Sequence, residues 1–372
     1  MQLVCWGVTF YQPAIFAPAI ARELGWPPSL AFSGLSLALA TMALVSPWCG
    51  RFIAAEGGRR PMLLGVALNA LGCVLLAGGS SKIGYGTAWL VLGVGMRLSL
   101  YDAAFAVLTQ LAGSGAAPAM QRITLLGGLS STLFWLLGEW LLQCVGWRLS
   151  MLVYASLALL CVPLIMSLPL GGGVQPSMPP ATVDSRVRSE GRVQWLYAAG
   201  VTLTAFLAAG ISTHLPGLLA GLQVPVALAA LWGIGQSVAR LLDLRWGVGL
   251  AAHLLNLWVA LALPVCFAVA LLAGQSVLLA ALFVCAYGAA NGLATRVRAA
   301  LPLMLMTPGE YARRTGVLLA PSFLFAALAP WCFAALRERF GDMATLGASL
   351  GIGLLILLMA LLMWMRLRRS AI

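Results

Sequence analysis

The stretch Thr87–Ala112 reads TAWLVLGVGMRLSLYDAAFAVLTQLA, and two charged residues stand inside this otherwise apolar run. About 20 apolar residues are enough for a helix to cross the hydrocarbon core of a bilayer. At the bilayer centre, Arg97 and Asp102 would each cost about 2.5–3.5 kcal/mol on insertion scales. The stretch therefore predicts a membrane-spanning helix whose two charges face protein or water rather than lipid.

Similar apolar runs recur along the whole chain of 372 residues, of which 62% are hydrophobic and 9% are charged. About a quarter of the residues in a soluble protein are charged. A membrane β-barrel would alternate apolar and polar residues over segments of about ten residues, and this chain does not. The composition predicts an all-α polytopic membrane protein.

Twelve spans are predicted, at 2–22, 30–53, 61–79, 87–112, 122–145, 149–168, 194–219, 225–244, 249–273, 276–300, 312–336 and 343–366. Sorting the basic residues by loop puts sixteen on one side of the membrane and five on the other, with Arg97 left inside. By the positive-inside rule both termini then face the cytoplasm. The net charge of +12 is explained by this topology and does not indicate nucleic-acid binding.

A long polar stretch, Leu170–Arg192, divides the chain and is rich in Gly, Pro, Ser and Arg. Such a composition is typical of a flexible linker. The predicted organisation is a six-helix half at 1–168, a cytoplasmic linker at 169–193 and a second six-helix half at 194–372. The pattern Pro18-x5-Leu24-x2-Pro27 recurs as Pro216-x5-Leu222-x2-Pro225, which indicates an internal repeat of the kind found in secondary transporters.

The segment Gly50–Arg60, GRFIAAEGGRR, resembles the loop between spans 2 and 3 of the major facilitator superfamily. Gly146-Trp147-Arg148 resembles that family's turn into span 6. Four further segments resemble the branch of bacterial monocarboxylate and oxalate/formate-type carriers: Tyr11, Phe16–Pro18, Glu23–Trp26 and His214–Leu219. The resemblance implies a secondary transporter of the bacterial inner membrane, with two six-helix halves that rock about a central site. It also implies that spans 1, 4, 7 and 10 line that site.

The loop between spans 2 and 3 departs from the family pattern. Ala54 stands where the family has an acidic residue, and Ala55 stands where it has the following basic one. The resemblance implicates that acid in an interdomain contact that gates the carrier. The second half keeps an acid at the equivalent place, Asp243. The gating candidates that the resemblance implies are Arg51, Arg59, Arg60, Arg240 and Asp243.

Span 4 carries the strongest binding candidate. On a continuous helix Arg97 and Tyr101 are four residues apart and share a face, whereas Asp102 lies about 140° around from Arg97. Arginine suits an anionic substrate because its planar fork meets a carboxylate with two hydrogen bonds. The alternative is that Arg97 forms a structural pair with Glu139 or with backbone carbonyls.

Three titratable residues are candidates for proton coupling: Glu139, Asp102 and His214. Glu139 lies in span 5 on a stripe with Trp135 and Gln143, each four residues apart. Burial would raise the pKa of this carboxylate and a nearby Arg97 would lower it, so a carboxylate balanced between the two could carry a proton. A histidine near a membrane surface could sense protons. The alternatives are an ion pair that orders spans 4 and 5 for Glu139, helix packing for Asp102, and an interfacial hydrogen bond for His214.

The remaining substrate-binding candidates are polar or aromatic residues near the middle of spans: Tyr11, Gln12, Trp135, Trp232, Gln236, Tyr287 and Asn291. Each could instead join membrane helices. The sequence holds no nucleophile-and-base motif and no phosphate-binding loop, so no enzyme, cofactor or metal site is predicted. The eight cysteines form no C-x-x-C pair, so no disulfide framework is predicted either.

The favoured prediction is proton-coupled movement of a small organic anion such as a monocarboxylate by a monomer in the bilayer. Its partners would be the small-molecule substrate and protons. One alternative is an exporter of an amphipathic or aromatic compound. Two others are an integral membrane enzyme and a non-transporting sensor descended from a carrier.

Overall fold

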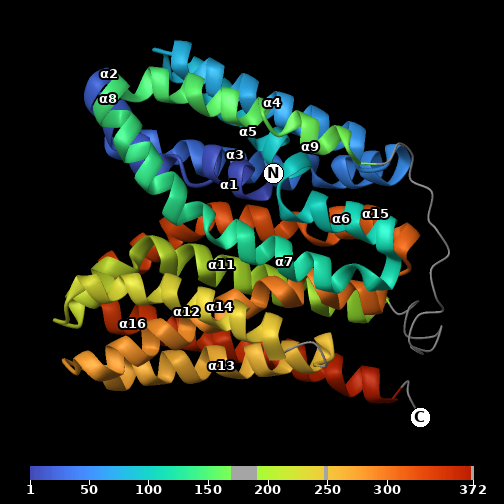
Figure 1. The fold of residues 1–372 in the computed structure, drawn as a ribbon. Helices are drawn as coiled ribbons and strands as arrows, with labels where there is room; N and C mark the ends of the chain where they lie inside the picture. Colours follow the sequence, from blue (N-terminus) through green and yellow to red (C-terminus); the bar gives the residue numbers. More distant parts are fainter. Residues whose placement is uncertain (169–190, 247–249, 370–372) are drawn as a thin grey trace. The chain divides into compact units, whose positions relative to one another are not determined.

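A computed structural model describes residues 1–168, 191–246 and 250–369 (Figure 1). These residues form helices and short connections, and no strand occurs in the described ranges. The all-α prediction is confirmed. The predicted linker at 169–193 falls outside the described residues except for its last three, with which the helix α11 begins.

Nine helical segments in the described part of the chain are long and apolar enough to cross a membrane. Two of them, Leu133–Met166 and Pro308–Arg368, contain a glycine with non-helical backbone angles. Gly146 has φ 74° and Gly341 has φ 82°, a conformation in which a residue with a Cβ is strained. The prediction of twelve spans in two halves stays a prediction.

The chain folds into two compact units. The first unit, Met1–Ala116, Ile123–Ser177 and Pro308–Ala320, holds the helices α1 Gln2–Val8, α2 Pro13–Leu24, α3 Pro28–Glu56, α4 Arg59–Gly78, α5 Lys82–Ser99, α6 Tyr101–Ala112, α8 Ser130–Leu159, α9 Val162–Met166 and α15 Pro308–Leu318, with the short turn η1 Gly113–Ala116. α15 comes from late in the chain, so this unit is not a single stretch of sequence.

The second unit, Ala117–Arg122, Met178–Thr307 and Pro321–Ile372, holds the helices α11 Gly191–Gly221, α12 Ala230–Trp246, α13 Ala252–Ala273, α14 Val277–Leu305 and nearly all of α16 Ala320–Arg369, with the turn η2 Val226–Ala229. α7, Ala117–Gly128, begins in this unit and ends in the first. In the core of the second unit, the rings of Phe267 and Phe283 pack against Tyr287.

Local signals explain where the helices begin. Proline, which lacks an N–H and has a helical φ, stands at the first turn of α2 and α3. The side-chain oxygen of Ser81 accepts a hydrogen bond from the N–H of Gly84 at the start of α5. Ser276 caps α14 in the same way through Leu279.

α3 and α15 cross at two glycines. A Cβ on Gly50 would lie 2.5 Å from the carbonyl oxygen of Ala312, and a Cβ on Gly316 would lie 2.9 Å from the Cα of Gly50. Small residues at such a crossing let two backbones approach closely, as in many membrane helix pairs. The sequence comparison singled out Gly50 as part of a loop motif, and its structural role is this contact.

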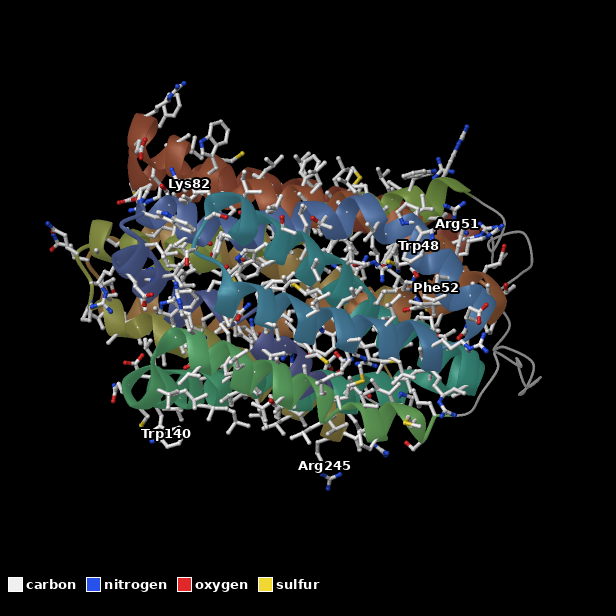
Figure 2. The ribbon with its side chains drawn as sticks, turned by 90° about the horizontal axis from the view of Figure 1, so that it is seen from above. Trp48, Arg51, Phe52, Lys82, Trp140 and Arg245 are labelled. Atoms are coloured by element: carbon white, nitrogen blue, oxygen red, sulfur yellow. The ribbon has the colours of Figure 1, made fainter. Side chains whose placement is uncertain are left out.

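Large apolar side chains remain exposed on the helices. Leu44 is 83% exposed, Trp140 is 59% exposed, and Trp48 stacks on Phe52 at the surface of α3. In Figure 2 Trp48, Arg51 and Phe52 lie together, well away from Lys82. Soluble proteins rarely show so much apolar surface. The surface agrees with an integral membrane protein.

Candidate functional site

Span 4 is broken between its two charged residues. α5 ends at Ser99, Leu100 is extended with φ −81° and ψ −170°, and α6 begins at Tyr101. Arg97 lies in the last turn of α5, and Asp102 lies in the first turn of α6. A helix favours a cation at its C-terminus and an anion at its N-terminus, so each charge has a stabilising helix end.

The span predicted at 87–112 lies within one candidate span, Lys82–Ala112, but its helix is not continuous. The expected shared face of Arg97 and Tyr101, and the angle of about 140° to Asp102, assumed unbroken helical geometry. Leu100 breaks that geometry because its ψ is far from the helical value. Breaks of this kind in membrane helices commonly border binding sites.

Arg97 is buried, with 2% of its surface exposed. Its Nε donates a hydrogen bond of 2.8 Å to Oγ of Ser46 on α3, and Ser46 is itself fully buried. Among the contacts of the described residues, Glu139 accepts a hydrogen bond from Gln143 at 3.1 Å, and no ion pair between Glu139 and Arg97 is present there. Ser46 is thus one partner of Arg97, and the alternative of a structural pair with backbone carbonyls stays a prediction.

The span predicted at 2–22 matches the candidate span Gln2–Leu24, and its helix is also interrupted. α1 ends at Val8, Thr9 has φ −122° and ψ −75°, and α2 begins at Pro13. Pro13 lacks the N–H that a continuing helix would use. The side chain of Thr9 bonds back to the carbonyl of Cys5 at 2.6 Å, which satisfies one polar group near the break.

Gln12 lies at this break and is 2% exposed. Neither the nitrogen nor the oxygen of its side-chain amide has a hydrogen-bond partner in the described part of the chain. Buried polar groups are nearly always hydrogen-bonded, and the exceptions often bind a ligand or water. Gln12 is therefore the residue that most directly indicates a ligand.

Aromatic rings gather at the two breaks, and we refer to them as the aromatic cluster: Trp6, Phe10, Tyr11, Tyr101, Phe105 and Trp135. The Trp6 and Tyr101 ring centres lie 4.7 Å apart, and those of Tyr11 and Trp135 lie 6.3 Å apart. The hydroxyl of Tyr101 also donates to the carbonyl of Thr124 at 3.2 Å. The cluster brings together three predicted binding residues: Tyr11 from the break between α1 and α2, Tyr101 from α6 and Trp135 from α8.

Three members of the aromatic cluster were missed by the sequence reasoning: Trp6, Phe10 and Phe105. The spacing of four between Trp6 and Phe10, and between Tyr101 and Phe105, was an available signal. Tyr101 and Phe105 stack in parallel with centres 5.6 Å apart. On a sequence in which apolar residues predominate, this spacing does not distinguish a binding site from ordinary packing.

The predicted residues of the second unit lie on α12 and α14. Trp232 and Tyr287 are 6.1 Å apart between ring centres, and the indole nitrogen of Trp232 has no hydrogen-bond partner among the described residues. Tyr287 is only 1% exposed and belongs to the core, which matches the packing alternative. Gln236 and Asn291 are half-buried.

Asp243 forms an ion pair with Arg296, and its other oxygen accepts a hydrogen bond of 2.9 Å from Gln121. Arg240 reaches the hydroxyl of Thr295 at 3.3 Å. The sequence comparison named Asp243 and Arg240, but it gave no signal for Arg296 or Gln121 as their neighbours. Of these groups, the Asp243 and Arg296 side chains are 9% and 12% exposed.

The other three gating candidates surround the loop between α3 and α4. Arg60 pairs with Glu56 at 2.5 Å, across the turn that joins α3 to α4. Arg51 is exposed and Arg59 is half-buried. In the described residues the strong ionic contact is thus at Asp243, where the acid is retained, and not at Ala54, where it is lost.

His214 connects two helices of the second unit. Its Nε2 lies 2.8 Å from the carbonyl oxygen of Pro330, to which it donates, and its Nδ1 accepts from Arg337 at 3.4 Å. Arg337 in turn donates to Asp342 at 2.6 Å. This pattern of one donor and one acceptor belongs to a neutral imidazole.

No protein-family model and no curated protein matches the chain. Among solved structures, the human organic anion transporter MFSD10 (TETRAN) is similar over 96% of this chain and 96% of its own, with a TM-score of 0.70 and 17% identity. The E. coli fucose:proton symporter FucP is similar over 97% of this chain and 96% of its own, with a TM-score of 0.76 and 14% identity. The proton:xylose symporter XylE of the major facilitator superfamily, bound to 6-bromo-6-deoxy-D-glucose, is similar over 98% of this chain and 94% of its own, with a TM-score of 0.75 and 16% identity.

These similarities extend over nearly the whole chain, and they show that it has the fold of major facilitator superfamily transporters. The expectation of that fold is confirmed. The resemblance to the monocarboxylate and oxalate/formate-type branch is not tested by these structures and stays a prediction.

Proposed function

We propose that this protein is a secondary active transporter that moves a small organic anion together with protons by alternating access. The observation that carries the proposal is the pair of broken helices in the first unit. A buried arginine, a buried amide without a partner among the described residues and the aromatic cluster lie at or beside these breaks, and α8 contributes Trp135. Discontinuous membrane helices with buried polar groups are the usual setting of transporter binding sites.

Arg97 is the proposed anion-binding residue. An arginine that stays charged and lies at a helix end is suited to a carboxylate, because two parallel N–H groups can meet its two oxygens. Gln12 would supply a further hydrogen bond, and the aromatic cluster would contact the apolar part of the substrate. In the second unit, the proposed substrate-binding residues remain Trp232, Gln236, Tyr287 and Asn291.

Glu139, Asp102 and His214 remain the proposed proton-coupling residues. Glu139 is exposed, and its one hydrogen bond in the described contacts is to a neutral amide. It can therefore exchange a proton without breaking an ion pair, whereas His214 is part of a larger network. We place Glu139 first among the three for this reason.

Arg51, Arg59, Arg60, Arg240 and Asp243 are the proposed gating residues. The proposed setting is the bacterial inner membrane, with both termini in the cytoplasm and the protein as a monomer. The sixteen-to-five division of basic residues supports this orientation.

The test uses purified protein in liposomes that contain a pH-sensitive dye. A panel of small organic anions and neutral aromatic compounds is added from outside. Acidification by one or more carboxylates, lost in Arg97→Gln with an unchanged melting temperature, is the expected result. The proposal fails if no anion moves protons while neutral compounds are transported.

A second function is favoured by one observation, the aromatic cluster. Aromatic rings beside a broken helix also suit an amphipathic or aromatic compound, so an exporter of such a compound is the alternative. In that case Arg97→Ala spares transport, whereas Trp135→Ala removes it. Binding without any flux would instead indicate a sensor descended from a carrier.

A further inference from the structure

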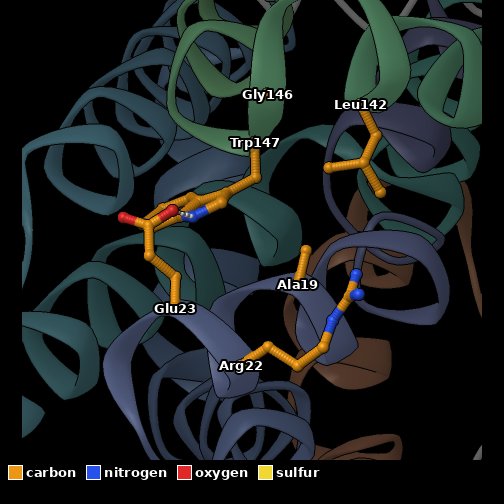
Figure 3. Close-up of a pocket in the computed structure, with 6 residues that line it drawn as sticks. All are labelled: Ala19, Arg22, Glu23, Leu142, Gly146 and Trp147. Atoms are coloured by element: carbon orange, nitrogen blue, oxygen red, sulfur yellow. Dashed lines mark hydrogen bonds between the residues drawn. The ribbon is translucent and has the colours of Figure 1, made fainter.

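A pocket of about 370 Å³ opens between the end of α2 and the Gly146 turn of α8. It is lined by Ala19, Arg22, Glu23, Leu142, Gly146 and Trp147 (Figure 3). The pocket is shallow and open to solvent, so it would cover only part of a small ligand, and Arg22 and Glu23 in its lining are exposed. All its residues belong to the first unit.

The acidic residue and the basic residue at the end of α2, Glu23 and Arg22, have different surroundings. Glu23 accepts a hydrogen bond of 2.6 Å from the indole nitrogen of Trp147 and forms an ion pair of 2.9 Å with Arg148. Arg148 also lies over the Trp147 ring at 4.2 Å. The charge of Glu23 is thus compensated by Arg148, and the segments Glu23–Trp26 and Gly146–Arg148, both singled out in the sequence, meet at this contact.

Arg22 has no hydrogen bond or ion pair within the part of the chain that the structure describes. Figure 3 shows its guanidinium extended toward Leu142, on the side of the pocket opposite the pair of Glu23 and Trp147. With Glu23 and Arg148 neutralising each other, Arg22 leaves a net positive charge on the pocket. Ala19 and Leu142 give it an apolar wall beside that charge.

We propose that this pocket binds the oxyanion head of a small amphipathic molecule, with the anion on Arg22 and the hydrocarbon part against Ala19 and Leu142. Nothing in this proposal requires the protein to be a transporter. The head group could come from a soluble carboxylate or from the phosphate of an anionic lipid, because an arginine fork accepts either.

The experiment measures equilibrium binding of radiolabelled benzoate to purified protein in phosphatidylcholine nanodiscs, after subtraction of empty discs. All measurements are made in an Arg97→Gln background, so that benzoate at the proposed transport site does not contribute. Arg22→Gln is compared with Lys82→Gln, which removes an exposed cation from the start of α5. Melting temperatures check that each variant is folded.

We expect Arg22→Gln to weaken benzoate binding about tenfold or more, because a hydrogen-bonded charge pair is lost. Arg22→Lys keeps the charge without the fork and gives an intermediate affinity, and Lys82→Gln leaves binding unchanged. The proposal is overturned if benzoate does not bind the Arg97→Gln protein, or if it binds Arg22→Gln with the same affinity.

A parallel series in discs that contain phosphatidylglycerol distinguishes the two sources of the head group. If the lipid phosphate occupies the pocket, benzoate binds more weakly in these discs, and Arg22→Gln removes the difference between the disc types. If the natural ligand is a soluble carboxylate, benzoate binds equally in both. Failure of the transport proposal would leave either result unchanged, because neither measures flux.

Discussion

The Nε atom of Arg97 donates a hydrogen bond of 2.8 Å to Oγ of Ser46, and this bond joins α5 to α3. Both side chains are buried, so the hydroxyl orients a charged group that cannot reach bulk water. Orientation matters for an arginine that binds a carboxylate through two parallel bonds. The position of Ser46 is therefore expected to affect the affinity for an anion.

Ser46→Ala is expected to raise the KM for the transported carboxylate roughly tenfold, since a hydrogen bond to a charged group is worth about 1.5–3 kcal/mol. The measurement is the initial rate of dye acidification against carboxylate concentration in proteoliposomes. Thr41→Ala is the matched control. Thr41 is on the same helix, and its hydroxyl donates to the carbonyl of Leu37, one turn earlier in that helix. An unchanged KM in Ser46→Ala would contradict the orienting role.

Gln12→Leu is expected to raise the melting temperature while lowering substrate affinity. A buried amide without a partner destabilises the fold by about 1–3 kcal/mol, and leucine of similar size removes that term. The measurement is thermal unfolding in detergent, followed by transport over a range of substrate concentrations. Wild-type transport by the stabilised variant would rule out Gln12 as a ligand-binding residue.

Gln110→Leu provides the comparison for Gln12. Gln110 is also buried, but its amide nitrogen donates to the carbonyl of Ile53 at 2.9 Å. Its replacement removes a hydrogen bond and leaves that carbonyl without this donor, so the melting temperature is expected to fall. The amide oxygen has no hydrogen-bond partner among the described residues in either glutamine, so opposite shifts in the two variants would show that the unpartnered amide nitrogen of Gln12 is the destabilising feature.

The all-α fold could be predicted because apolar runs and short polar breaks depend only on composition and periodicity. The helix break at Leu100 could not be predicted in the same way, whereas Pro13 was a signal for the break after Val8. Leu100 is neither a glycine nor a proline, and it has an ordinary apolar side chain. Its extended backbone depends on tertiary packing around Ser99, whose hydroxyl and carbonyl bond to Asn69 and Gln2.

Only part of the candidate site could be predicted, because the sequence singles out charged residues in apolar runs more clearly than aromatic ones. Arg97 stood out because a charge in an apolar run is costly wherever it lies. Trp6 did not stand out, because an aromatic residue in a membrane span is ordinary. Glu139 was expected beside Arg97 because both lie in neighbouring spans, but its bond to Gln143 depends on the rotation of α8, which the sequence does not give.

Asp243→Asn is expected to lower the free energy of unfolding by about 3–5 kcal/mol, because it leaves the largely buried Arg296 without its charge partner. Arg296→Gln in the same chain should recover part of this loss. The measurement is a double-mutant cycle on thermal stability. Glu56→Gln is the control, since the exposed pair with Arg60 is worth about 0.2–1 kcal/mol. Equal effects of the two acid substitutions would contradict the buried pairing.

Gly50→Ala is expected to destabilise the protein by about 1–3 kcal/mol, because its Cβ would overlap the backbone of α15. Backbone atoms cannot move aside as a flexible side chain can. Gly200→Ala on α11 is the matched control: its Cβ meets nothing within 4 Å, so a gain of about 0.5–1 kcal/mol is expected from helix propensity. Thermal unfolding of both variants compares them, and a stabilised Gly50→Ala would contradict the close crossing of α3 and α15.

His214→Phe is expected to lower the melting temperature and to change the number of protons moved per substrate less than Glu139→Gln does. The variant keeps the ring that stacks on Phe333 at 6.4 Å, and it removes the hydrogen bonds to Pro330 and Arg337. Lost bonds of this kind are worth about 1–3 kcal/mol. Glu139→Gln is expected to lower the number of protons moved per substrate and to leave the melting temperature nearly unchanged. Its carboxylate is exposed and has only an amide partner among the described residues. The ratio is measured from dye acidification and radiolabelled substrate uptake in the same liposomes. A changed ratio in His214→Phe with an unchanged ratio in Glu139→Gln would transfer the coupling role to His214.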